Sequence, residues 1–143
     1  MSHLKEIRTS LEVGFPEGNL PEAFVRFRGK QTRSIRALAE FPYEDGQFDV
    51  VLMDGGVVSA KTIREAHRVL HPEGRLFFTV PERTKKQEGY TLPDIYSIVR
   101  EGFNITEVTR PAWWFFGSRG RTISICATKK AWKAVTNTYR PYV

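Results

Sequence analysis

The stretch from Phe41 to Pro81 constrains the fold more than any other part of the chain. Its apolar run from Asp49 to Met53 is typical of a strand that is buried on both faces of a parallel sheet. Ser59 predicts the N-cap of a helix, Pro72 predicts its end, and Leu76 to Val80 predicts a second buried strand. A strand, a helix and a strand in this order predict a right-handed parallel crossover, and therefore an α/β fold.

Further elements are predicted on both sides of this crossover. Asn19 is the expected cap of the first helix, Thr91 caps the last one, and the two final strands are expected to pair antiparallel because a glycine-bearing turn separates them. The predicted strands are Thr9 to Phe15, Thr32 to Ala39, Asn104 to Thr109 and Thr122 to Thr128, and the predicted helices are Leu20 to Arg28 and Thr91 to Gly102.

Length and composition predict one globular domain over residues 1–130, followed by a tail over residues 131–143. No apolar run approaches the roughly 20 residues of a membrane helix, so no membrane partner is expected. The N-terminus lacks an apolar signal core, which favours a cytoplasmic protein. The single cysteine, Cys126, excludes an internal disulfide; a buried strand cysteine is favoured over a reactive thiol.

Basic residues gather in three places in a chain of formal net charge +6. Such clusters can contact phosphate groups, which makes nucleic acid a candidate partner; a solvated basic surface is the alternative. The clusters are Arg26, Arg28, Lys30, Arg33 and Arg36; Arg83, Lys85 and Lys86; and Lys129, Lys130 and Lys133.

The amino-acid sequence of the central stretch resembles that of the class I S-adenosylmethionine-dependent methyltransferases. FPYEDGQFDVV is similar to the family's LPF-x-D-x-x-FDVV, which leads into the fourth strand, and HRVLHPEGRLFFTVP is similar to its RVLKPGGRL helix end and fifth strand. The resemblance covers about residues 35–130. It implies a Rossmann-like methyltransferase-type sheet, mostly parallel with an antiparallel C-terminal hairpin, and S-adenosylmethionine as the cofactor.

The resemblance also implies a cofactor site at the ends of the first and fourth strands of the family. The residues that correspond to it here are Glu12, Gly14, Gly18, Met53 and Asp54. Pro16 stands at the central glycine of the family's loop, and proline fixes φ and removes an N–H donor. The segment is therefore either a descendant of the cofactor loop or an ordinary turn. No catalytic base can be named.

The chain is short where this family binds its cofactor. Only 29 residues separate Gly18 from Phe48, whereas two helices and two strands need about 45. The sequence therefore predicts that one strand–helix unit is lacking. The acid that binds the ribose in the family has no assignable counterpart, and Ala37 stands where an Asp near the adenine is usual.

Three other places in the sequence carry residues that could bind a metal or a partner. Asp54 resembles a metal-binding Asp of some O-methyltransferases, but Val80, Pro81 and Glu82 stand where these enzymes have an Asp-Asn pair, so a turn cap or a ligand contact is favoured and no metal is predicted. His67 and His71 lie four residues apart without an evident third ligand, which favours structural roles. The bulky run Trp113, Trp114, Phe115 and Phe116 favours self-association or packing over nucleic-acid binding or a pocket wall.

Three functions are compatible with these observations. The chain is a methyltransferase-like protein with an altered cofactor loop, a non-catalytic binding or regulatory subunit built on the same scaffold, or a nucleic-acid-binding module.

Overall fold

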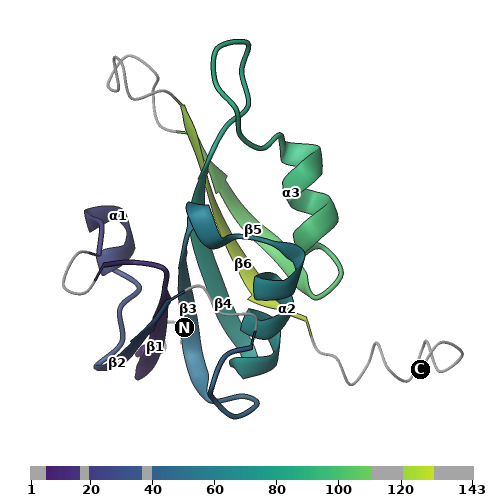
Figure 1. Cartoon of the computed structure of the whole chain (residues 1–143). Coiled ribbons are helices and arrows are strands. Elements are labelled where there is room, and N and C mark those ends of the chain that lie inside the picture. The colour runs from purple at the N-terminus through teal and green to yellow at the C-terminus, as the bar shows by residue number, and fades with distance from the viewer. Residues whose placement is uncertain (1–5, 17–19, 37–39, 111–120, 131–143) are drawn as a thin grey trace, which may run out of the picture.

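The computed structural model describes residues 6–16, 20–36, 40–110 and 121–130. Their strands form one mixed sheet in the order β2-β1-β3-β4-β6-β5, in which β2, β1, β3 and β4 are parallel and β6 and β5 are antiparallel (Figure 1). The strands are β1 (Thr9–Val13), β2 (Gln31–Ile35), β3 (Phe48–Asp54), β4 (Leu70–Pro81), β5 (Phe103–Thr109) and β6 (Thr122–Lys129); the helices are α1 (Glu22–Val25), α2 (Ala60–Val69) and α3 (Leu92–Val99), with a 3₁₀ turn, η1, over Gly55–Val57.

The main core lies on the face of the sheet that α2 and α3 cover. In Figure 1 these two helices lie on one side of the sheet and α1 lies on the other. Alternate residues of every central strand point into this core, as the period of a strand requires. They include Leu11, Val13, Val51, Met53, Leu76, Phe78, Ile123 and Ile125, all completely buried.

The opposite face of the sheet is largely polar, with one small apolar patch under α1. Phe77 of β4 contacts the rings of Phe24 and Phe27, with centroid distances of 4.8 and 4.5 Å. Val50, Leu52 and Cys126 complete this patch. Beyond it, Thr79 and Ser124 bond to each other through their hydroxyls at 2.9 Å. This face is thus adapted to partial contact with water, and the two phenylalanines of the α1 region each contribute about 1.5–3 kcal/mol by burial.

The predicted crossover is confirmed. Ser59 caps α2, and it forms a capping box with Thr62: the Thr62 N–H donates to Ser59 Oγ at 3.2 Å, and the Ser59 N–H donates to Thr62 Oγ1 at 2.9 Å. Thr91 and Asp94 form the same box at the start of α3, as the sequence predicts. The two helices therefore begin where side-chain oxygens can satisfy free backbone donors.

The end of α2 differs from the prediction. The helix ends at Val69, and β4 already begins at Leu70, so Pro72 and Gly74 lie inside an irregular start of that strand and do not stop the helix. The register of β3 with β4 shifts between the pairs Phe48–Leu70 and Val50–Arg75. Glu73 takes a positive φ of 67° within this irregularity. A strand tolerates proline and extra residues at such a bulge.

The region between β1 and β3 is short, as predicted. Its described residues contain one helix and one strand, α1 and β2, where the family resemblance implies two of each. α1 has only four residues, its N-cap is Pro21, and no side chain caps it. The predicted cap, Asn19, lies outside the described residues, as do Gly18 and Ala37.

The predicted C-terminal hairpin is also confirmed, because β5 and β6 pair antiparallel. Ser10, Val50, Arg75 and Thr128 lie in one row across the sheet. β1 therefore begins and β6 ends at the same edge, which we call the amino edge because the parallel strands start there; the opposite edge is the carboxyl edge. The aromatic run 113–116 and the tail 131–143 lie outside the described residues.

Candidate functional site: the carboxyl edge of the sheet

Gly14 follows β1 at the carboxyl edge and takes a conformation that favours glycine. Its φ is +89°, and its N–H donates to the carbonyl of Ile35 at 2.9 Å, which ties the end of β1 to the end of β2. A Cβ at this position would lie 2.9 Å from Cγ1 of Val57 and 3.2 Å from Cβ of Asp54. The space beside Gly14 is thus occupied by Val57, so packing within the protein already requires a glycine here.

Asp54 ends β3 next to Gly14 and caps the 3₁₀ turn η1. Its Oδ2 accepts the N–H of Gly56 at 3.0 Å. The next residue, Gly55, has no room for a Cβ, because one would collide with the carbonyl oxygen of Thr79 on β4. The sequence Asp-Gly-Gly therefore makes a tight turn against the neighbouring strand, and Asp54 caps that turn, which is one of the two roles that the sequence favours for it.

Glu12 lies on the polar face of the sheet, beneath the α1 segment. Its side chain is only 5% exposed, and Oε2 accepts a hydrogen bond from Nε of Arg28 at 2.8 Å. The hydroxyl of Ser34 lies 3.5 Å from the other carboxylate oxygen. A buried carboxylate needs such a cation, because an uncompensated charge in this place costs several kcal/mol, roughly 3–5. Glu12 thereby fastens the residues after α1 to β1.

Met53 is completely buried and belongs to the main core. It points to the α2 and α3 side of the sheet, whereas Glu12 points to the α1 side, since strand residues alternate. The structure therefore brings Gly14 and Asp54 together and places Met53 and Glu12 on opposite faces. Gly18 lies outside the described residues. In this arrangement the four described residues do not fit S-adenosylmethionine as one open cradle.

The loop after β1 turns toward α1. Phe15 packs edge-on against Phe24 with a centroid distance of 4.9 Å. This contact places an aromatic side chain of the loop in the apolar patch on the polar face. The residue after β2 is Arg36, which is exposed and basic where the family resemblance implies an acid.

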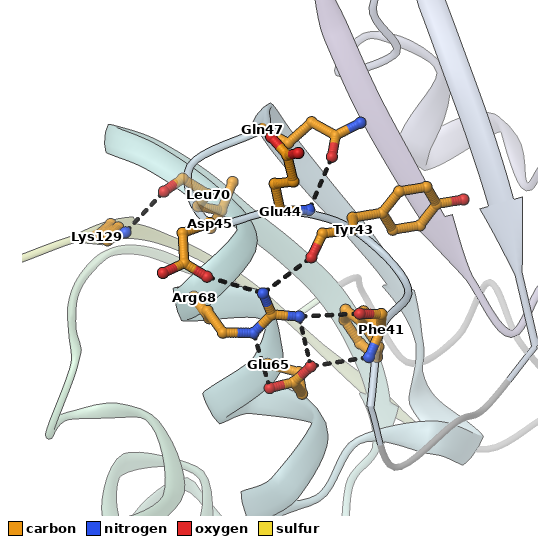
Figure 2. Close-up of polar contacts among 9 residues, drawn as sticks. All are labelled: Phe41, Tyr43, Glu44, Asp45, Gln47, Glu65, Arg68, Leu70 and Lys129. Carbon is orange, nitrogen blue, oxygen red and sulfur yellow. Dashed lines mark hydrogen bonds and ion pairs between the residues drawn. The ribbon is translucent and has the colours of Figure 1, made fainter.

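Sequence reasoning missed the best-developed polar cluster of the structure, which surrounds Arg68 on α2 (Figure 2). Its guanidinium donates to the carbonyls of Phe41 and Tyr43, each at 2.9 Å, and pairs with Asp45 at 2.8 Å and Glu65 at 2.9 Å. Glu65 also accepts the N–H of Phe41 at 2.8 Å. The hydrogen bonds from Arg68 hold the pKa of Glu65 below its ordinary value.

This cluster explains physically why FPYEDG and EAHRVL occur together in one chain. Each segment supplies groups that the other needs: the loop offers free carbonyls, and α2 offers the donors. The i, i+3 spacing of Glu65 and Arg68 was the available signal, since it puts both side chains on one face of a helix. The role of these residues is to fix the path into β3.

His67 and His71 belong to different elements, since His67 lies in α2 and His71 lies in β4. His67 is buried against the ring of Phe103, at a centroid distance of 5.4 Å, and burial together with the positive charge of Lys129 lowers its pKa to about 4. His71 lies at the amino edge, beside Pro72. Within the described ranges, no group of three or more His, Cys, Asp or Glu side chains could hold a metal ion. The contact with Phe103 gives His67 a place in the packing between α2 and β5.

A cavity of about 480 Å³ lies at the amino edge of the sheet, far along the strands from Gly14 and Asp54. It is lined by both acids and bases, so its charge favours no single class of ligand. The residues around it include Arg8, Asp49, His71, Glu73 and Arg75. Asp49 is partly committed to the fold, because its Oδ2 accepts the N–H groups of Arg8 and Thr9.

Comparison with known proteins agrees with this fold. The sequence model of the family described as "Methyltransferase domain" matches residues 18–78. Among solved structures, a putative methyltransferase from Bacillus halodurans has 16% identity and a TM-score of 0.65, with 89% of this chain and 94% of that chain covered. A search of curated proteins gives no match.

Two further structures are similar to this chain at the level of the fold. A SAM-dependent methyltransferase from Methanosarcina mazei has 14% identity and a TM-score of 0.65, with 87% of this chain and 93% of that chain covered. The 1,6-didemethyltoxoflavin-N1-methyltransferase of Burkholderia thailandensis, solved with S-adenosylhomocysteine bound, has 16% identity and a TM-score of 0.68 over 90% of this chain and 74% of that chain.

The sheet order, the crossover and these matches define a Rossmann-like α/β protein of the methyltransferase type. The chain therefore has the fold of the class I S-adenosylmethionine-dependent methyltransferases, and its residues 18–78 match the sequence model of a methyltransferase domain. Binding of S-adenosylmethionine is a trait of that family. In the part of the chain that the structure describes, no helix is long and apolar enough to cross a membrane.

Proposed function

We propose that this chain uses the methyltransferase fold as a non-catalytic binding or regulatory subunit. The observation that carries the proposal is that its carboxyl edge is occupied by its own side chains. Val57 fills the space beside Gly14, Arg28 neutralises Glu12, and the carboxylate of Asp54 caps η1. Of the residues that the family resemblance assigns to a cofactor, Glu12, Gly14 and Asp54 thus contact groups of the protein itself.

The sequence of the edge supports the same proposal. Pro16 replaces a glycine whose N–H and conformational freedom the family loop uses. Arg36 stands after β2, where an acid would be needed to accept hydrogen bonds from ribose hydroxyls. The family match itself begins at residue 18, after Glu12, Gly14 and Pro16.

A working S-adenosylmethionine-dependent methyltransferase is the second candidate. It is favoured by the positive φ of Gly14 directly after β1, beside Asp54 at the end of β3, because ligands of open α/β sheets bind at the carboxyl ends of the strands. In that case the cofactor would supply the methyl group, and Gly14 and Asp54 would lie nearest to it.

Titration calorimetry with S-adenosylhomocysteine separates the two candidates. We expect no saturable heat from the natural chain at a protein concentration of about 0.1 mM, which is a hundredfold above a micromolar Kd. The matched variant is Pro16→Gly, which restores the glycine and its N–H without touching β1. Saturable binding to the natural chain, followed by methyl transfer to any acceptor, would contradict the proposal.

The aromatic run 113–116 and the basic clusters stay predictions about partners. Self-association through the run is checked by light scattering of the full chain. A stable oligomer that is lost when Trp113 and Trp114 are both replaced by serine would support the predicted role of the run.

A further inference from the structure

The strand β2 has an open side. Among the described residues it has one hydrogen-bonded neighbour, β1, and it forms the end of the sheet. The family resemblance implies a further strand–helix unit between β1 and β3, and residues 20–36 and 40–47 contain only α1 and β2. An edge strand with free backbone groups is a template on which another strand can add.

The backbone geometry shows which groups are free. Gln31 donates its N–H to the carbonyl of Arg8, and the carbonyl of Ile35 accepts from Gly14, so Gln31 and Ile35 bond toward β1. Successive residues of a strand direct their N–H and C=O groups to opposite sides. The backbone groups of Thr32 and Ser34 therefore point away from β1, to the open side, where the carbonyl of Thr32 has a 3.5 Å contact with Nη1 of Arg33.

The side chains of this strand set the chemistry of a partner. Arg33 pairs in register with Leu11, and Ile35 pairs with Val13, so both lie on the face of the main core. Arg33 is exposed, whereas Ile35 is half-buried against the core. A strand added beside β2 would gain an ion pair from an acidic residue next to Arg33 and apolar contact from a residue next to Ile35.

Two basic residues that flank β2 along the chain, Lys30 and Arg36, are also exposed, and Lys30 forms an ion pair with Glu6 at 2.7 Å. They argue against a second copy of the chain as the occupant. If two β2 strands paired antiparallel about their centres, Arg33 would face Arg33, with Lys30 of each copy near Arg36 of the other. Like charges directly opposite each other destabilise a strand pair.

We propose that β2 is a docking edge for an acidic, extended segment of a partner protein, which adds as a strand and places an acid beside Arg33 and an apolar residue beside Ile35. The inference rests on the proposed function, for which it names the class of partner. The phosphates of a nucleic acid can pair with the basic side chains and accept from the outward N–H groups, but they cannot donate to the outward carbonyls of Thr32 and Ser34. A peptide satisfies both the charges and the backbone.

The test uses a fluorescein-labelled, capped peptide of about nine residues with the core Glu-Thr-Val-Thr-Glu, long enough for a typical strand. The core has the same sequence in both directions, so it can match Arg33 and Ile35 in a parallel or an antiparallel pairing. Fluorescence anisotropy with the full chain should show saturable binding that weakens with added salt. The control peptide has lysine in place of both glutamates, and it should not bind.

Two substitutions of Ser34 test whether the peptide binds to the outward N–H group of the β2 backbone. Ser34→Pro removes the outward N–H and no bond to β1, a change that edge strands tolerate. Ser34→Ala removes the same hydroxyl, with its 3.5 Å contact to Glu12, and keeps the N–H. We expect Ser34→Ala to bind the peptide like the natural chain and Ser34→Pro to lose binding, while circular dichroism shows both to be folded. Equal affinity of the two variants would overturn the proposal.

A second pair of variants tests the charge. Arg33→Glu should weaken binding about tenfold, because it replaces an attraction with a repulsion across the pair. Lys61→Glu makes the same change of charge at an exposed position of α2 and should have little effect. If both variants weaken binding equally, the peptide senses only net charge, and the proposal fails.

Three further outcomes would also overturn it. These are no binding of the peptide at low salt, a dimer that Ser34→Pro dissociates, and an oligodeoxythymidine that binds the natural chain and Ser34→Pro equally while the peptide binds neither. The calorimetry with S-adenosylhomocysteine is run on the same preparation. Cofactor binding with methyl transfer refutes the proposed function, whereas peptide failure without cofactor heat refutes the docking edge alone.

Discussion

At the scale of single residues, several positions have roles that require contacts distant in sequence. Gly14 is a glycine because Val57 lies beside it, and Glu12 is tolerated because Arg28 reaches it. Both residues resemble parts of a cofactor motif, and the motif was the reason to single them out. Their neighbours in space could not be predicted, because 42 residues separate Gly14 from Val57 and no local pattern connects them.

His67 gives the clearest prediction at this scale. Its pKa is about 4 in the folded protein, against an ordinary value of 6.5, because burial disfavours the charged imidazolium and Lys129 repels it. Between these two pKa values the unfolded chain binds a proton that the folded chain does not bind. The free energy of unfolding should therefore fall as the pH falls from 6.5 to about 4, by at most about 3 kcal/mol from this group.

Urea unfolding at a series of pH values from 7 down to 4.5 measures this dependence. The matched variant is His67→Gln, which keeps a polar side chain of similar size and removes the titration. The slope of stability against pH should be smaller in the variant, whatever its stability at pH 7. Parallel curves for the two proteins would show that His67 does not titrate as described.

At the scale of elements, the cap residues predicted where α2 and α3 begin, whereas the sequence did not predict where α2 ends and β4 begins. Ser59 and Thr91 begin their helices as predicted, because a cap is satisfied by residues three positions away. The start of β4 was missed, because pairing of Leu70 with Phe48 overrides the breaking signals of Pro72 and Gly74. Long-range pairing thus decided where local signals conflicted.

The cluster around Arg68 predicts how the loop before β3 is held. Arg68→Met removes the hydrogen bonds to the carbonyls of Phe41 and Tyr43 and both ion pairs, and it leaves Glu65 without its cation. We expect a loss of about 2 kcal/mol in the free energy of unfolding and faster proteolysis within residues 41–47, because partly buried acceptors lose their donors.

The control for this substitution is Arg64→Met on the same helix. Arg64 is exposed and lies one turn before Arg68, so the same chemical change should alter stability by less than about 0.5 kcal/mol. An equal loss in the two variants would mean that helix propensity or charge, and not the contacts to the loop, accounts for the effect.

At the scale of the whole molecule, the two faces of the sheet differ in the extent of the apolar core that they carry. The α2 and α3 face carries the main core, whereas the other face has an apolar patch confined to the neighbourhood of α1. The family-like motifs of the sequence predicted the class of fold, and the short distance from Gly18 to Phe48 predicted that one strand–helix unit is lacking. The sequence did not predict that the face toward α1 is largely polar. The alternation of residues in β6 shows which side chains share a face, but it does not show which elements cover that face.

Hydrogen exchange should reveal this asymmetry. Amides of α1 and the outward amides of Thr32 and Ser34 should exchange through local openings, because α1 is short and uncapped and β2 is an edge strand. Amides in the centre of β3 and β4, such as those of Leu52 and Phe77, should exchange only through global unfolding. Protection of α1 equal to that of β3 would contradict this description.

The shared amino edge has a consequence for protein engineering. β1 begins and β6 ends at that edge, and β3 and β4 lie between them, so the two ends are three strand spacings apart, about 14 Å. Two short linkers could therefore splice residues 9–129 into a surface loop of a host protein as a guest domain. In such a chimera Gly14 and Asp54 would face away from the host, and the whole carboxyl edge would be presented to solvent.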